Sequence, residues 1–227
     1  MLPKKILIIH FGGIGDLIMF TPALLLLREK FPDARIDVFP GYTLESGDIF
    51  DEGKTVNKIY KFNFPVENIF EKLKFIRRLR KEKYDISIVN TGANPLLGSI
   101  FSFLCGAKKR IGDSKHWGLF FYTKTIKLDY QKHKIETNLN LLKALDIKIQ
   151  NPLPSPFFET SSVDEEFAEK FLASHNLKNM VLMGFFPGSG PKQKFKAWSK
   201  ENYIILGRQI LKNIPNAAIL IFGSRSE

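Results

Sequence analysis

The sequence predicts an α/β protein made of two domains, each built around a doubly wound parallel sheet. Continuous apolar runs such as Ile6–Ile9 are typical of strands that are buried on both faces of such a sheet. A segment with helical periodicity follows most of these runs, so that predicted strands and helices alternate along the chain. A proline-rich segment, residues 151–156, interrupts the alternation, which then restarts. These three observations indicate the fold class and a domain boundary.

The first predicted domain covers residues 1–150. Its first strand is expected at residues 4–10, followed by a glycine-rich loop and a helix over residues 16–30. Pro22 within that helix predicts a first turn and a kink rather than one straight rod. Further strands are expected at 35–39, 56–62, 84–90 and 109–112, and further helices at 66–81, 95–105 and 133–145.

The second predicted domain covers residues 157–227. Helices are expected at 163–174 and 199–212, and strands at 180–186 and 217–222. Two strands and two helices cannot cover both faces of a sheet, so we expect these residues to be the first part of a larger domain, truncated in this chain. The alternative is a small sheet completed by the first domain or by a partner.

Composition narrows the function classes. The net charge of +11 favours an anionic partner, namely nucleic acid, anionic lipid or a phosphorylated substrate, although a solvated lysine-rich surface would explain it as well. A single cysteine, Cys105, excludes a disulfide framework and a cysteine metal site and indicates a reducing compartment. The apolar run Leu17–Leu27 contains a proline and is shorter than the roughly 20 residues of a membrane-spanning helix.

The first glycine-rich loop lies between a buried strand and a helix, where backbone amides bind anions. A dinucleotide fingerprint fits it poorly, because Ile18 stands where the third glycine belongs and Asp16 would repel a pyrophosphate. The second strand also ends without the expected acidic residue. A nicotinamide or flavin enzyme is therefore disfavoured.

Asp16 has two interpretations. Aspartate is a preferred helix N-cap, which stabilises a helix by about 1 kcal/mol. Alternatively, a carboxylate at the carboxyl edge of a parallel sheet faces the crevice where ligands bind and can act as a general base.

The second glycine-rich loop, residues 187–198, follows a predicted strand and precedes a helix that Ser199 can cap. It is not a P-loop, because the Lys-Ser/Thr pair is missing after its second glycine. Its small residues permit close backbone approach, and its lysines supply charge that can hold a diphosphate without a metal ion. No Asp-x-Asp pair occurs to chelate a divalent ion. We expect Trp198 to pack rather than to stack on a ligand.

The two loops together resemble glycosyltransferase family 9, which includes the ADP-heptose:lipopolysaccharide heptosyltransferases. The run Lys5–Ile9 leading into Gly13–Asp16, and then Thr21–Leu24 and Phe31–Ala34, looks like the start of that family. The segment from Pro187 to Trp198 resembles its donor-phosphate motif, and Gly223–Glu227 resembles its ribose-contacting turn. His133 and Glu136 match the family's approach to the interdomain region, although a plain helix start explains them equally well.

The resemblance implies a GT-B-like fold with two Rossmann-like domains, the acceptor on the first and the nucleotide sugar on the second. It implies an enzyme that inverts the sugar carbon without metal or other cofactor, with Asp16 as the catalytic base. The family's loop is shorter before its Lys-x-Trp, so Lys194 could replace Lys196 as the phosphate contact, and which of Lys192, Lys194 and Lys196 contacts the phosphate stays open. The implied donor-binding residues are Gly188, Ser189, Gly190, Lys194, Lys196 and Glu227, and the implied acceptor loop is Gly12, Gly13, Ile14 and Gly15.

The expected partners are a nucleotide sugar such as ADP-heptose and a lipopolysaccharide core or other anionic glycolipid, not nucleic acid. The expected location is the cytoplasm, with peripheral contact at the inner membrane. The family's later glycine-rich segment would lie beyond Glu227, which leaves open an inactive family member that acts as a binding or assembly module. A nucleotide-dependent oxidoreductase is the remote third reading.

Overall fold

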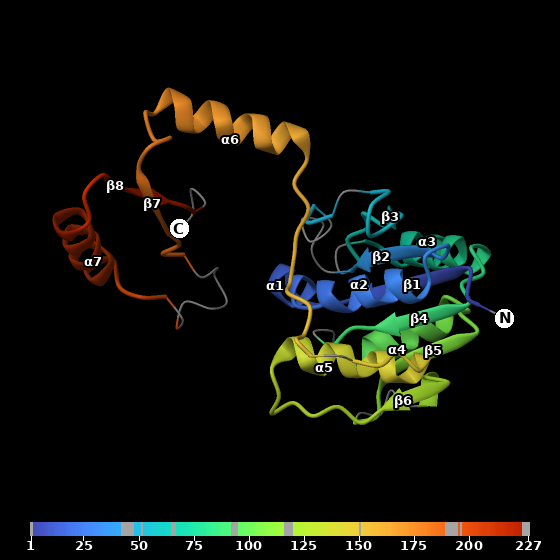
Figure 1. Ribbon diagram of the computed structural model, residues 1–227. Coiled ribbons are helices and arrows are strands. Elements are labelled where there is room, and N and C mark those ends of the chain that lie inside the picture. Colours follow the sequence, from blue (N-terminus) through green and yellow to red (C-terminus); the bar gives the residue numbers. More distant parts are fainter. Residues whose placement is uncertain are drawn as a thin grey trace. The chain divides into compact units, whose positions relative to one another are not determined.

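A computed structural model describes residues 2–41, 48–50, 52–64, 67–91, 95–115, 120–149, 151–188, 195 and 197–223. The chain forms two compact units, residues 1–160 and 161–227 (Figure 1). Within the described ranges, no helix is long and apolar enough to cross a membrane.

The first unit contains a parallel six-stranded sheet in the order β3-β2-β1-β4-β5-β6 (Figure 1). This order runs outward in both directions from β1 and β4, as in doubly wound folds. The strands are β1 (Lys5–His10), β2 (Arg35–Pro40), β3 (Lys58–Ile59), β4 (Ile86–Val89), β5 (Lys109–Asp113) and β6 (Lys124–Ile126).

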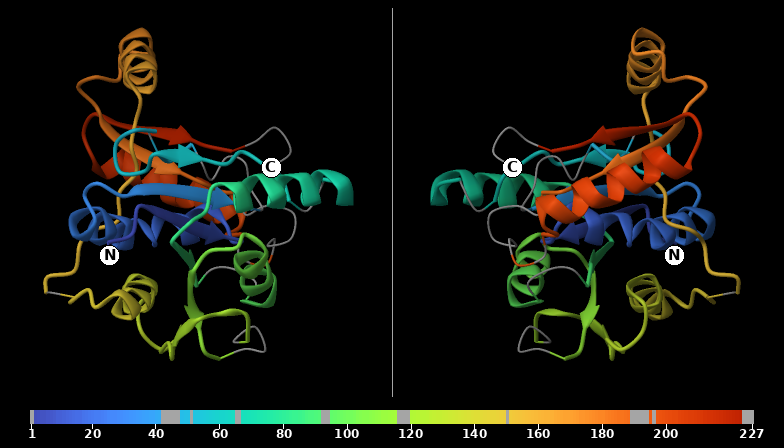
Figure 2. Two further views of the ribbon diagram at one scale, coloured as in Figure 1. Left: turned by 90° about the vertical axis from the view of Figure 1, so that its right-hand side faces the viewer. Right: turned by 90° about the vertical axis from the view of Figure 1, so that its left-hand side faces the viewer.

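Helices cover both faces of this sheet (Figure 2). On one face, α1 (Ile14–Ile18), α2 (Thr21–Lys30), α5 (Lys134–Asn140) and the 3₁₀ helix η3 (Leu141–Leu145) pack on the core that contains Ile6 and Ile8. On the other face, α3 (Ile69–Lys81) and α4 (Pro95–Leu104) pack on the core that contains Leu7 and Ile9. Alternate residues of β1 therefore serve opposite cores, which explains its continuous apolar run.

Phenylalanine rings fill the second of these cores. Phe11 lies edge-on to Phe39 at 5.6 Å between ring centroids and to Phe101 at 5.5 Å. Gly41 lies directly against Phe11, since a Cβ atom at position 41 would be 2.2 Å from the Phe11 ring. The ring of Phe11 thus anchors the start of the first glycine-rich loop in the core, and it requires a residue without a side chain at position 41.

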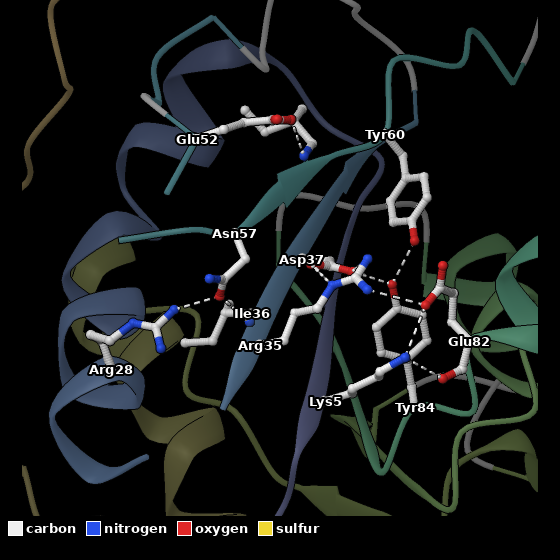
Figure 3. A network of polar contacts seen from close by, with 11 residues as sticks. Lys5, Arg28, Arg35, Ile36, Asp37, Glu52, Asn57, Tyr60, Glu82 and Tyr84 are labelled. Carbon is white, nitrogen blue, oxygen red and sulfur yellow. Dashed lines mark hydrogen bonds and ion pairs between the residues drawn. The ribbon is translucent and has the colours of Figure 1, made fainter. Parts of the chain in front are cut away.

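A buried carboxylate joins β2 to the start of β4 (Figure 3). Asp37 is fully buried, 2.7 Å from a guanidinium nitrogen of Arg35, and accepts a hydrogen bond of 2.5 Å from the Tyr84 hydroxyl. The Tyr60 and Tyr84 hydroxyls lie 2.8 Å apart. The hydrogen bond to Asp37 raises the pKa of Arg35, and burial raises the pKa of Tyr84. The network satisfies a charge that would be costly to bury alone.

Side chains take over part of the hydrogen bonding at β3, which is shorter than the predicted strand over residues 56–62. The side-chain oxygen of Asn57 accepts from the Ile36 N–H at 2.8 Å and from Arg28 at 2.7 Å (Figure 3). The Glu52 carboxylate accepts from the Ile59 N–H at 2.7 Å. The Asn57 side chain thus replaces a backbone acceptor for the Ile36 N–H, while the backbone N–H groups of Asn57 and Tyr60 donate to the carbonyl oxygens of Ile36 and Val38.

Two other predicted elements differ in detail. The helix expected over residues 16–30 consists of α1 and α2, with Pro22 in the first turn of α2, so the predicted break is confirmed. The helix expected over residues 133–145 is α5 followed by η3, and the short strand β6 was not predicted.

The second unit contains α6 (Ser162–Ser174), β7 (Val181–Phe185), α7 (Lys200–Asn213) and β8 (Ala217–Ile221). Strands β7 and β8 pair in parallel. The side chain of Ser199 accepts a hydrogen bond of 3.3 Å from the Asn202 N–H, so the predicted cap of α7 is confirmed.

The segment before α6 belongs to the first unit. The Phe157 N–H donates to Thr21 Oγ1 at 2.9 Å, and the Thr55 hydroxyl donates to the Glu159 carboxylate at 2.9 Å. These bonds hold the chain against the first unit up to residue 159.

Candidate active site

The carboxyl ends of β1 and β4 lie side by side at the centre of the sheet. From β1 the strand order proceeds through β2 to β3, and from β4 it proceeds through β5 to β6. A crevice at such a switch point is where doubly wound sheets bind ligands. The first glycine-rich loop follows β1, and Asn90 and Thr91 follow β4, so both segments lie at this crevice.

The loop turns into α1 immediately. Gly13 is the N-cap of α1, and Asp16 lies in the first turn of the helix. The interpretation of Asp16 as the N-cap is therefore wrong, because the helix begins two residues before it. Leu17 is buried, which fixes this turn on the core while the Asp16 side chain keeps 41% of its surface exposed.

Lys134, the first residue of α5, faces Asp16. Its ammonium nitrogen lies 3.5 Å from Asp16 Oδ1 and donates a hydrogen bond of 3.1 Å to the Thr91 backbone oxygen. The side-chain amide of Asn90 lies 3.5 Å from the Asp16 backbone oxygen. Residues from the end of β4 and the start of α5 therefore meet around Asp16, and Lys134 is the one that contacts its carboxylate in the described part of the chain.

Asn138, one turn further along α5, joins the segments that follow β1 and β4. Its side-chain amide donates to the Met19 backbone oxygen at 2.9 Å, and its carbonyl oxygen accepts from the Thr91 hydroxyl. Asn138 is fully buried, so these bonds replace the water that its amide would otherwise bind. Lys134 and Asn138 lie four residues apart on one side of the helix, and together they hold it against the loop.

His10 ends β1 directly beneath the loop. Its Nε2 atom lies 2.9 Å from the Gly13 backbone oxygen, while Nδ1 is buried and has no hydrogen-bond partner among the residues that the structure describes. Burial lowers the pKa of His10 from its ordinary value of 6.5. The neutral ring with hydrogen on Nε2 fits these contacts and fixes the backbone at Gly13.

The glycines of this loop leave open space. A Cβ atom added at Gly13 or Gly15 would have no other atom within 4 Å, so packing within the described part of the chain does not exclude a side chain at either position. Ile14 between them is 45% exposed. The predicted loop residues therefore present an accessible backbone beside Asp16.

Sequence reasoning selected Asp16 and missed the residues that surround it. His10, Asn90, Thr91, Lys134 and Asn138 carry no motif of their own. A usable signal was present for Asn90 and Thr91, which come directly after a buried strand, at the edge where ligand-binding side chains are found.

The second predicted site is only partly described. Gly188 is exposed after β7, and Trp198 packs edge-on against Tyr203 with 5.1 Å between the ring centroids. The other predicted donor-binding residues lie outside the described residues: Ser189, Gly190, Lys192, Lys194, Lys196 and Glu227. Their roles stay predictions.

Other reactive groups lie apart from this site. Cys105 is buried, and burial raises the pKa of its thiol, so the thiolate is disfavoured. In the described ranges, no group of three or more histidine, cysteine, aspartate or glutamate side chains could hold a metal ion.

The fold resembles that of several solved structures. A glycosyl transferase of family 9 from Veillonella parvula DSM 2008 gives a TM-score of 0.77 at 20% identity, covering 98% of this chain and 63% of that one. The Escherichia coli ADP-heptose lipopolysaccharide heptosyltransferase II gives 0.75 at 22% identity, covering 98% and 65%. An E. coli heptosyltransferase with ADP gives 0.66 at 15%, covering 98% and 68%. These likenesses confirm the predicted GT-B-like α/β fold.

The sequence itself was compared with curated proteins and with family models. No curated protein matches it. Residues 72–227, more than half of the chain, match the model described as glycosyltransferase family 9 (heptosyltransferase). The chain therefore belongs to glycosyltransferase family 9.

Proposed function

We propose that this chain serves in an inverting, metal-independent glycosyltransferase that moves a heptose from a nucleotide diphosphate to a lipopolysaccharide core or related surface glycan. The position of Asp16 carries the proposal, because a partly exposed carboxylate stands at the switch point of the sheet beside an open glycine backbone. The family and the ligands of the solved relatives, ADP and ADP-2-deoxy-2-fluoro heptose, support the donor class.

In this mechanism Asp16 accepts the proton of the acceptor hydroxyl while the hydroxyl oxygen attacks the anomeric carbon. The bond between that carbon and the diphosphate breaks on the opposite face, so the configuration inverts. Lys134 holds the Asp16 carboxylate in place at the end of β4. The leaving diphosphate carries the electron pair away.

The second loop would stabilise that diphosphate. Ser189 offers a hydroxyl, and Lys194 and Lys196 offer positive charge that takes the place of a divalent ion. Glu227 would bind the ribose, and Gly188 and Gly190 would let the backbone approach the phosphates. No cofactor besides the nucleotide sugar is needed for this chemistry.

The substitution Asp16→Asn tests the base. Asparagine keeps the size of the side chain but removes the proton acceptor, so we expect the rate of sugar transfer from ADP-heptose to fall about 10²- to 10⁴-fold. The control is Asp33→Asn, which alters an exposed carboxylate in the turn after α2. Undiminished transfer by Asp16→Asn would remove Asp16 from this role.

Titration of the chain with ADP addresses the alternative reading, a catalytically inactive binding module. Tight ADP binding that Asp16→Asn leaves unchanged would support the donor assignment. Absence of ADP binding would favour the inactive module. Because binding and transfer are measured separately, loss of one step is not mistaken for loss of the other.

A further inference from the structure

Helix α3 exposes large apolar side chains on its outward side. Phe75 and Leu79 point into the core on the opposite side of the helix. In the first turns of α3, Ile69 is 61% exposed, Phe70 is 78% exposed and Leu73 is 45% exposed. Three neighbouring apolar side chains in water mark a surface that binds something apolar.

The same outward side is strongly basic. At 100° per residue, Phe70 and Leu73 lie with the basic side chains within about 120° of the helix circumference. Glu71 is the only acidic residue between Ile69 and Lys81; it lies outside this arc, with its carboxylate 3.7 Å from the Lys74 ammonium. The exposed basic residues in this arc are Lys74, Arg77, Arg80 and Lys81.

An open groove of about 540 Å³ runs beside these cations. The stacked rings of Phe62 and Phe75, with centroids 4.1 Å apart, form part of its lining. Its other lining residues are one carboxylate, Glu71, and four cations, Lys74, Arg77, Arg78 and Lys81. The groove therefore joins apolar walls to several positive charges, as a phosphate-bearing headgroup requires.

We propose that α3 is a peripheral docking helix for an anionic lipid bilayer. Phe70 and Leu73 would enter the boundary between headgroups and acyl chains, and the basic side chains would contact lipid phosphates. A helix with apolar residues beside a dense cationic face binds in the plane of such a membrane. Nucleic acid is a poorer fit, since exposed aliphatic Ile69 and Leu73 gain nothing against a phosphate backbone.

The orientation of α3 links this surface to the crevice of the first unit. A helix that connects parallel strands runs back along the sheet, so the first turns of α3 and α4 lie at the carboxyl edge. Leu96, in the first turn of α4, is also exposed. If the proposed function holds, docking through α3 would bring a lipid-linked acceptor to the edge that bears Asp16; the docking itself does not depend on that function.

Co-sedimentation with vesicles tests the docking. The chain should bind vesicles of 70% phosphatidylcholine and 30% phosphatidylglycerol, and should bind pure phosphatidylcholine at least about tenfold more weakly. Replacing Lys74, Arg77, Arg80 and Lys81 by glutamine should weaken binding to the anionic vesicles by more than about tenfold. The matched control replaces the same number of exposed lysines elsewhere in the first unit by glutamine: Lys124, Lys127, Lys143 and Lys148.

A second pair of variants distinguishes insertion of the α3 apolar side chains into the bilayer from attraction of the chain to the lipid surface by charge alone. Phe70→Trp should shift its fluorescence to shorter wavelength on anionic vesicles, whereas Phe158→Trp, at another exposed phenylalanine, should not. Equal losses for the two glutamine sets, or no shift for Phe70→Trp, would overturn the proposal. So would binding of a short DNA duplex at least as tight as binding of the anionic vesicles.

Discussion

The ammonium group of Lys134 lies 3.5 Å from the carboxylate of Asp16, although the two residues belong to elements at opposite ends of the first unit's sequence. The same ammonium donates to the Thr91 backbone oxygen at the end of β4. A single side chain thus ties the proposed base to the central strand beside it. This places Lys134 as a positioning residue rather than a catalytic one.

Replacing Lys134 by methionine should lower the rate of sugar transfer about 10- to 100-fold, because a misplaced base accepts the proton of the acceptor hydroxyl less efficiently. Lys134→Arg should retain more activity, since it can still pair with Asp16. Lys132→Met is the matched control, because Lys132 pairs with the partly exposed Glu136. Steady-state kinetics over a range of pH would check this, and equal kinetics for Lys134→Met and Lys132→Met would contradict it.

Gly15→Ala separates folding from ligand access. Alanine favours a helix over glycine by about 1 kcal/mol, and a Cβ atom at this position meets no atom of another described segment within 4 Å. The free energy of unfolding, measured in urea, should therefore stay level or rise. Sugar transfer should nevertheless fall if the acceptor approaches this backbone, and an unchanged KM for the acceptor would argue against that approach.

Tyr84→Phe should destabilise the first unit by about 1–3 kcal/mol, because buried Asp37 loses a hydrogen-bond donor. The control is Tyr130→Phe. The Tyr130 hydroxyl donates to Asp113 at an exposed site, so its loss should lower the free energy of unfolding by less than about 0.5 kcal/mol. Urea denaturation measures both. Similar midpoints for the two variants would show that the buried network contributes little.

Stability should fall as the pH falls below about 6.5, in part because of His10. Burial lowers the pKa of His10 in the folded chain, so below its ordinary value of 6.5 the unfolded chain binds more protons. The stabilisation is complete above pH 6.5 and is lost as the pH falls towards the folded pKa.

His10→Gln removes this titration and should flatten the pH dependence, since glutamine can still donate to the Gly13 oxygen. His175→Gln, which alters an exposed histidine of the second unit, should leave the dependence as it is. Urea denaturation at pH 7.5 and pH 5.5 would compare the variants. A pH dependence that His10→Gln does not reduce would contradict the assignment.

The alternation of apolar runs and helical segments was enough to predict the parallel sheet, because each strand had to be buried on both faces. It could not predict β6, whose three residues Lys124–Ile126 form an edge with little apolar content. It also overestimated β3, beside which the Asn57 side chain replaces a backbone group as the acceptor for the Ile36 N–H. Such side-chain substitutes for backbone pairing leave no periodic signal.

The candidate site also contains residues with a local sequence signal and residues without one. Asp16 could be found because the glycines before it break a local pattern. Asn90 could be found as a residue at the end of a buried strand, but its closeness to Asp16, and that of Lys134, follows only from the strand order that sets β4 beside β1. That order depends on contacts between distant parts of the chain, which a single sequence does not display.

The contact between Phe11 and Gly41 also constrains how related sequences can differ. Any side chain at position 41 would occupy the space of the Phe11 ring, so the two positions can change only together. Relatives with alanine or a larger residue at position 41 should carry a smaller side chain at position 11. An alignment of family members would therefore show paired substitutions at two positions 30 residues apart in sequence, joined where Gly41 N–H bonds to the carbonyl oxygen of His10.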